Sequence, residues 1–138
     1  MNTSSKTCDS VTVRQPSDIV LARSCARAMA ARLGFGKADQ TRLATAVSEL
    51  TRNVVMYAGS GECHITDTSD AEFKRIEITV QDQGPGIADM ELAMQDGFST
   101  GSSMGAGLAG TRRLVENFSL ESAPGLTKVT VSLSLRRL

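Results

Sequence analysis

Apolar residues recur along this chain with two periods, and each period predicts one kind of secondary structure. A spacing of three and four residues predicts two helices in the first half of the chain. One helix should be capped by Ser17 and ended by Gly34, and the next should cover residues 39–57, until the turn at 59–61 breaks it. The second helix should bury one stripe, made of Leu43, Val47, Leu50 and Val54.

Strict alternation of apolar and polar residues predicts the strands. The first should contain Val11 and Val13, and two more should cover residues 62–66 and 75–82, joined by a polar loop. Parity places Asp82 on the same side of its strand as three apolar residues, Ile76, Ile78 and Val80. We therefore expect this carboxylate to point toward the buried side of a sheet.

The last third of the chain predicts a short helix near residues 89–95, a longer one over 108–117, and a closing hairpin. The hairpin combines a strand at 118–122 with a strand in which apolar residues alternate strictly, at Val129, Val131, Leu133 and Leu135. Strands are grouped beside helices rather than alternating with them. The pattern therefore favours an α+β sandwich with one mostly antiparallel sheet.

Composition is that of an ordinary globular protein, with 41% apolar and 22% charged residues. Residues 1–138 should form a single domain, with residues 1–9 loose. Fifteen acidic and fifteen basic residues give zero net charge, so neither nucleic acid nor an anionic membrane is a favoured partner. No apolar run is long enough for a membrane span or a signal core, and the three scattered cysteines should be free thiols in a reducing cytoplasm.

Glu49 and Asn53 are the first candidates for chemistry. Four residues apart on a helix, they share one face, which is displaced from the buried stripe. A carboxylate there can act as a general base toward a hydroxyl, and a carboxamide oxygen is a neutral ligand suited to Mg²⁺. The pair alone is more typical of a solvated polar helix face, because Glu and Asn four residues apart are common.

Asp82 is more informative, because a carboxylate on the buried side of a sheet needs hydrogen-bond donors. The exocyclic amine of adenine is one such donor, and a carboxylate would select adenine over guanine. The alternative is a carboxylate that caps its own turn at residues 83–86. Gly84 and Gly86 would allow a tight turn and a close approach of the backbone to a ligand.

Glycine is concentrated in one segment, with seven of the twelve glycines between Gly84 and Gly110. This clustering predicts a mobile loop that faces a ligand. Residues 105–108 should open a helix, whose exposed N–H groups suit an anion, although a plain flexible turn fits the same residues. Because no Lys or Arg lies between Arg75 and Arg112, backbone amides, Mg²⁺ and hydroxyl groups would have to compensate bound phosphates. A P-loop is excluded, since the chain has no Gly-Lys-Ser/Thr triplet.

In this order and spacing, the segments resemble the motifs of the GHKL ATP-binding superfamily, which includes gyrase, Hsp90, histidine kinases and MutL. Residues 49–53 match its N box, 82–86 its first glycine box and 105–108 its second. Gly125-Leu126-Thr127 resembles a third glycine box that normally reads Gly-Thr, here interrupted by Leu126. The strings at 33–36, 48–53 and 96–100 are similar to RsbT-type switch kinases of bacterial stress signalling, relatives of the anti-sigma-factor kinases RsbW and SpoIIAB.

The resemblance implies a Bergerat fold, in which helices cover one mixed, mainly antiparallel sheet and ATP–Mg²⁺ lies beneath a mobile lid. Glu49 would be the catalytic base and Asn53 the Mg²⁺ ligand, while Asp82 would bind the adenine amine. The implied ATP-binding residues are Asn53, Asp82, Gly84, Gly86, Ile87, Gly105, Ala106, Gly107, Leu108 and Thr127. The implied lid consists of Gly97, Phe98, Ser99, Thr100, Gly101, Ser102, Ser103 and Met104.

RsbT-type proteins phosphorylate Ser or Thr on STAS-domain proteins of a sensory complex, the stressosome. Once released, they activate a PP2C-type phosphatase or another output protein. The leading hypothesis is therefore a protein serine/threonine kinase that is also a partner switch. The alternative is an RsbW-like anti-sigma factor, which sequesters a sigma factor and phosphorylates an anti-anti-sigma protein. A histidine kinase acting on itself is disfavoured, because the lone His64 lies between a glycine turn and a strand.

Overall fold

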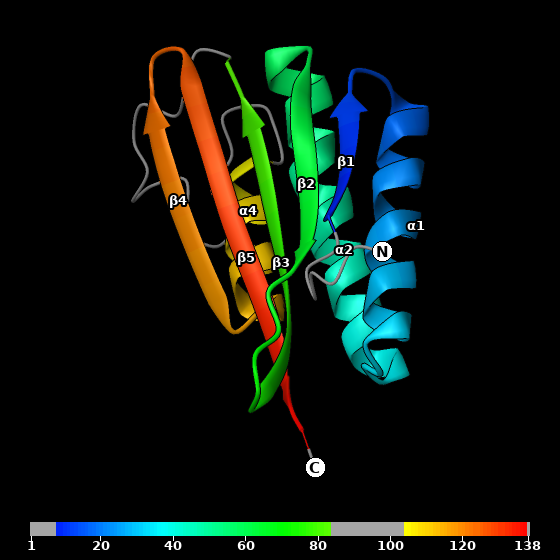
Figure 1. Ribbon diagram of the computed structural model, residues 1–138. Coiled ribbons are helices and arrows are strands. Elements are labelled where there is room, and N and C mark those ends of the chain that lie inside the picture. The colour runs from blue at the N-terminus through cyan, green and yellow to red at the C-terminus, as the bar shows by residue number, and fades with distance from the viewer. Residues whose placement is uncertain (1–7, 84–103, 138) are drawn as a thin grey trace.

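The structure, a computed structural model of the chain, describes residues 8–83 and 104–137. In these residues, helices cover one face of a five-stranded sheet and leave the other face open (Figure 1). The helical elements are α1 (Pro16–Arg32), α2 (Lys37–Asn53), a π-helical turn η1 (Val54–Ala58) and α4 (Met104–Leu114). The strands are β1 (Cys8–Val13), β2 (Gly61–Asp67), β3 (Phe73–Asp82), β4 (Asn117–Ala123) and β5 (Leu126–Arg136).

The strand order is β1-β2-β3-β5-β4, and every pairing among these strands is antiparallel. The predicted α+β class and helix-over-sheet layering are confirmed. The sheet was expected to be mixed, but no parallel pair occurs among the strands that the structure describes. β5 lies between β3 and β4, so the long strand after the last turn returns to the middle of the sheet.

The core lies between the helices and the covered face of the sheet. The predicted stripe is confirmed along α2 and into η1, since Leu43 and Val47 are 0% exposed and Leu50 and Val54 are 2% exposed. Opposite this stripe lie the buried alternating residues of the central strands, Ile76, Ile78, Val80, Val129, Val131 and Leu133. Burial of each such side chain contributes roughly 1.5–3 kcal/mol to stability. The apolar residues at the two predicted periods therefore hold the helices against the sheet.

The first helix differs from the prediction at its start. Its N-cap is Gln15 rather than Ser17, and Pro16 occupies the first helical position. The carboxylate of Asp18 accepts hydrogen bonds from the backbone N–H groups of Arg14 at 2.9 Å and Gln15 at 3.2 Å. Proline has no N–H to satisfy and Asp18 completes a capping box, so these residues determine the start and leave Ser17 in the first turn. Gly34, with φ of 92°, follows the helix end as predicted.

The second predicted helix, over residues 39–57, proves to be two elements. The α-helix begins at Lys37 and ends at Asn53, and a wider π-helical turn continues to Ala58. The N–H of Gly59 donates to the carbonyl of Val54 at 2.9 Å, which closes this turn five residues back. Such turns are rare and often lie at functional sites, and hydrophobic periodicity does not distinguish them from an α-helix.

The helix predicted over residues 108–117 was wrong at both ends, because α4 covers Met104–Leu114. The early end has a visible cause. The N–H of Glu116 donates to the carbonyl of Ser132, and Asn117 already pairs with Ser132 as the first residue of β4. The helix predicted at 89–95 lies outside the described residues. Within the described parts of the chain, no helix is long and apolar enough to cross a membrane.

Candidate nucleotide-binding site

The last turns of α2 present Glu49 and Asn53 beside the buried stripe. Both side chains are half-buried, whereas their neighbours Leu50 and Thr51 are buried. The hydroxyl of Thr51 donates to the carbonyl of Val47 at 2.7 Å, so the hydrogen bond that this buried hydroxyl needs is made within the helix. Glu49 and Asn53 therefore lie at the margin of the core, as their spacing predicted, where they can reach a ligand without being sealed inside.

The covered face of the sheet changes from apolar to polar in its last row. Across β1, β2, β3 and β5, one row of paired residues is apolar, consisting of Val11, Cys63, Val80 and Val129. The next row toward the sheet end pairs Gly61 with Asp82, Asp82 with Thr127, and Thr127 with Ser122. This row, which continues to the buried Val13 on β1, places a carboxylate and two hydroxyl groups next to the apolar row.

Hydrogen bonding orders the hydroxyl groups of this polar row. The Ser122 and Thr127 hydroxyl oxygens are 3.2 Å apart, and Asp82 and Thr127 are both half-buried. Sequence reasoning proposed Asp82 and Thr127 but missed Ser122, which belongs to the row only because β4 pairs with β5. The one available signal was its place in an alternating strand directly before the turn.

Among the described residues, the surface is hollowed at the end of the sheet beside Asp82. A hollow of about 290 Å³ is lined there by Thr12, Arg14, Ser60, Gly61, Glu62, Gln81, Asp82, Gln83 and Leu126. Thr12, Glu62 and Gln81 belong to the open face, so this hollow reaches Asp82 from the open side of the sheet.

The proposed phosphate-binding segment is only partly described. Gly105, Ala106 and Gly107 lie in the first turn of α4, which begins at Met104 rather than after the glycines. Met104, expected in the lid, is therefore the first residue of a helix. Leu108 is 2% exposed and packs in the core, so its side chain anchors α4, and only its backbone can face a ligand. Gly84, Gly86, Ile87 and the expected lid residues from Gly97 to Ser103 lie outside the described residues.

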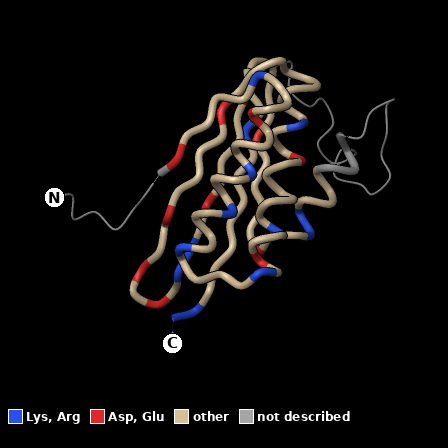
Figure 2. Tube along the Cα trace, turned by 90° about the vertical axis from the view of Figure 1, so that its right-hand side faces the viewer, with Lys and Arg blue, Asp and Glu red and all other residues tan. Residues whose placement is uncertain are grey.

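The helices carry an excess of basic residues although the net charge of the chain is zero. The sequences of α1, α2 and α4 contain eight Lys or Arg residues and three acidic residues. Figure 2 shows the basic residues along the helices and acidic residues around β1 and the β2–β3 hairpin. This excess, which the overall charge balance did not predict, favours an anionic ligand or partner on the helix side of the molecule.

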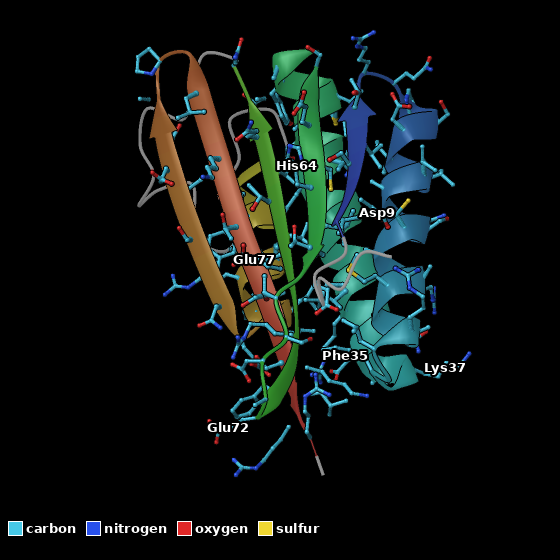
Figure 3. All side chains as sticks on the ribbon, viewed as in Figure 1. Asp9, Phe35, Lys37, His64, Glu72 and Glu77 are labelled. Carbon is cyan, nitrogen blue, oxygen red and sulfur yellow. The ribbon has the colours of Figure 1, made fainter. Side chains whose placement is uncertain are left out.

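His64 takes no part in this site. It lies on β2, which Figure 3 shows with the open face of the sheet toward the viewer. Its Nδ1 is 2.9 Å from the Ser10 hydroxyl, and its Nε2 is 3.0 Å from Glu62 Oε1. Both ring nitrogens are therefore engaged on the surface away from the helices, which agrees with the sequence argument against a phosphate-accepting role in this chain.

Cys25 and Cys63 are free thiols, as predicted. Burial raises the pKa of Cys63 to about 12, and proximity to Cys25 adds to this rise. Burial, followed by the charge of Asp9, also raises the pKa of Cys25, against the opposing effect of Arg32. Raised pKa values keep both groups protonated and unreactive. Among the described residues, no cluster of three or more His, Cys, Asp or Glu side chains could hold a metal.

Comparison with known proteins places these features in a family. The family pattern described as "Histidine kinase-, DNA gyrase B-, and HSP90-like ATPase" matches residues 38–137. The chain is 50% identical over 108 residues to the serine/threonine-protein kinase RsbT of Bacillus subtilis, which covers 78% of this chain and 81% of that protein. It is 32% identical over 108 residues to an anti-sigma F factor of Caldanaerobacter subterraneus, which covers 75% of this chain and 76% of that protein.

Two solved structures share the fold. The RsbU and RsbW domains of Rv1364c from Mycobacterium tuberculosis match with a TM-score of 0.66 and 17% identity, over 98% of this chain and 34% of that one. The mycobacterial sensor histidine kinase MprB matches with a TM-score of 0.58 and 18% identity, over 96% of this chain and 100% of that one. At these identities the likeness concerns the fold alone.

Proposed function

Because the chain belongs to the family of histidine kinase-, DNA gyrase B- and HSP90-like ATPases, we propose that it is a partner-switching protein serine/threonine kinase of the RsbT type. The observation that carries the proposal is the polar row Asp82–Thr127–Ser122, which interrupts an apolar sheet face beside the end of α2. The 50% sequence identity to a serine/threonine-protein kinase, over most of both chains, also supports kinase activity.

Asp82 is assigned to the adenine. Its carboxylate accepts a hydrogen bond from the exocyclic amine, and a guanine, which presents a carbonyl oxygen at that position, would be repelled. Thr127 stands directly opposite and can bond to the base edge or orient the carboxylate. The half-buried position strengthens this recognition, because water competes less for the carboxylate than at an exposed site.

Asn53 and Glu49 are assigned to the phosphate end of ATP. The carboxamide oxygen of Asn53 is a hard, neutral donor, which fits Mg²⁺, and this donor lies at the half-buried end of α2. When bound, Mg²⁺ would neutralise charge on the phosphate oxygens. Glu49 lies one helical turn away, on the same face, and is positioned to act as the base.

The reaction needs little from the protein beyond positioning and one proton transfer. The Ser or Thr oxygen of the substrate protein bonds to the γ-phosphorus while the bond to the leaving oxygen of ADP breaks. Glu49 accepts the hydroxyl proton. We assign the substrates to STAS-domain proteins of the stressosome type, similar to RsbS and RsbR. The released kinase would then activate a PP2C-type phosphatase similar to RsbU, or another output protein.

Phosphotransfer from γ-labelled ATP to a cognate STAS-domain protein tests this function, with Asn53→Ala as the control. We expect Mg²⁺-dependent label on Ser or Thr with the wild-type chain and none with the variant. ATP binding without transfer to any STAS-domain protein would contradict the proposal.

A second candidate is favoured by the anti-sigma F factor relatives, one of which is 32% identical. In that case the chain would sequester a sigma factor, and phosphorylation of an anti-anti-sigma protein would release it. Affinity purification from the native cell distinguishes the two, because recovery of a sigma factor in place of a STAS-domain scaffold would favour the anti-sigma function.

A further inference from the structure

We propose that Gly61 is a positioning residue for adenine recognition, because its lack of a side chain lets the ends of β3 and α2 meet at one point and so determines where Asp82 lies. The inference rests on the proposed function, in which Asp82 binds adenine. Gly61 begins β2 and pairs with Asp82 on one side and with Val13 on the other. Every other residue of this row has a side chain. The row consists of Val13, Gly61, Asp82, Thr127 and Ser122.

Space, rather than backbone conformation, requires glycine at this position. Among the described glycines, Gly34, Gly59 and Gly125 have positive φ, but Gly61 does not. A Cβ built on Gly61 would overlap the carbonyl oxygen of Gln81, and it would lie 2.8 Å from Val54 Cγ1 and 3.1 Å from Asp82 Cβ. Any side chain at residue 61 would therefore occupy volume that the end of β3 already fills.

Val54 links the same point to the end of α2. It directly follows Asn53, it is the first residue of the π-helical turn, and its side chain is 2% exposed. Its carbonyl accepts the hydrogen bond from Gly59 that closes this turn. The methyl group of Val54 borders the space where a Cβ on Gly61 would lie, so the residue after Asn53 meets β2 at the residue that pairs with Asp82.

A methyl group at residue 61 can be accommodated only if one of these parts moves. The Gln81 oxygen belongs to the backbone of β3 and Val54 is packed in the core, so neither can turn aside as a flexible side chain would. The end of β3 must then move away from β2, and Asp82 moves with it. Misplacement of a recognition group by about 1 Å can cost on the order of 100-fold in activity.

The test compares Gly61→Ala with Gly36→Ala, since a Cβ at Gly36 meets nothing within 4 Å and its φ is −70°. ATP and GTP affinities of both variants would be measured by calorimetry, with circular dichroism and thermal unfolding as folding controls. For Gly61→Ala we expect ATP affinity to fall by about tenfold or more, with a smaller preference for ATP over GTP. Gly36→Ala should bind both nucleotides as the wild type does.

The preference for ATP over GTP separates positioning from simple destabilisation. A variant that is only less stable would lose affinity for both nucleotides in proportion, and that result would overturn the inference. If Gly61→Ala does not fold, Val54→Ala provides the test, because it removes the methyl group that borders the space above Gly61 without adding volume. Its ATP preference should fall several-fold, and an unchanged preference would contradict the proposal.

Asp82→Asn separates this inference from the proposed function. If Asp82→Asn binds ATP as the wild type does, the assignment of adenine to Asp82 is wrong and the inference fails with it. If Asp82→Asn loses ATP while folded Gly61→Ala keeps wild-type affinity and preference, the proposed function stands and the positioning role of Gly61 is wrong.

Discussion

Asp82, at the end of β3, lies directly opposite Thr127, at the start of β5, and on the same face of β3 as the buried Val80. The rows before this pair are apolar, and Val80 and Val129 form the preceding apolar pair. At the Asp82–Thr127 pair, a carboxylate and a hydroxyl group follow these apolar pairs, and the hydroxyl group is 3.2 Å from that of Ser122. The pair therefore marks the place where the apolar residues of β3 and β5 give way to polar ones on the covered face.

Replacement of Asp82 by Asn should abolish tight ATP binding while the fold survives. The amide side chain of Asn has the same size as the carboxylate but is neutral. The charged oxygen that accepts a hydrogen bond from the adenine amine is therefore lost. A bond to a charged group is worth about 1.5–3 kcal/mol, so we expect the Kd for ATP to rise roughly 10- to 150-fold. Calorimetric titration measures this, and circular dichroism checks the fold. Unchanged affinity in a folded variant would refute the adenine assignment.

Replacement of Glu49 by Gln should spare ATP binding and depress phosphotransfer. The amide occupies the same half-buried position at the end of α2 but cannot accept the hydroxyl proton. General-base catalysis contributes typically about 10²- to 10⁴-fold, and a loss of kcat within this range is expected. Single-turnover transfer from labelled ATP separates the chemical step from binding. A variant with full kcat would remove Glu49 from the role of base.

Replacement of Thr127 by Val should weaken ATP binding modestly. Valine keeps the shape of the side chain and removes the hydroxyl group, which also leaves the Ser122 hydroxyl without this partner at 3.2 Å. Loss of one hydrogen bond costs about 0.5–1.5 kcal/mol, which corresponds to roughly a two- to twelvefold rise in Kd.

Thr130→Val is the matched control for Thr127→Val. Thr130 lies on the same strand but on the open face, where it pairs with Thr79 and Ser119. ATP affinity should not change in this variant. Equal effects of the two substitutions would mean that Thr127 acts through the stability of β5 rather than through the ligand.

Cys63 should make stability depend on pH in the alkaline range. Its pKa is about 12 in the folded chain, against 9.0 for an unperturbed thiol. A folded-state pKa above the unfolded value means that the contribution is fully present below pH 9 and is lost as pH rises toward 12. Urea unfolding between pH 8 and pH 11 should show this decline, and Cys63→Val should show a shallower one. An identical decline in the variant would exclude Cys63 as its source.

Periodicity in the sequence determined much of the fold in advance. The stripe of Leu43 and Val47 and the alternation of Ile76 and Ile78 predicted which faces are buried, because burial of apolar surface follows from residue type and local geometry alone. The same parity rule placed Asp82 on the covered face. The exact helix limits were less predictable: Pro16 and Asp18 outweighed Ser17 as a start signal, and three glycines, at 105, 107 and 110, lie within α4.

What the sequence alone determined is therefore the identity and local orientation of Glu49, Asn53 and Asp82, since each depends on its own helix or strand. Only the tertiary structure decided which distant residues join them. Pairing of β5 between β3 and β4 brings Thr127 and Ser122 into the row of Asp82, and the π-helical turn brings Val54 onto Gly61. Such contacts depend on long-range strand register and on packed volume, and neither is written in the period of a single segment.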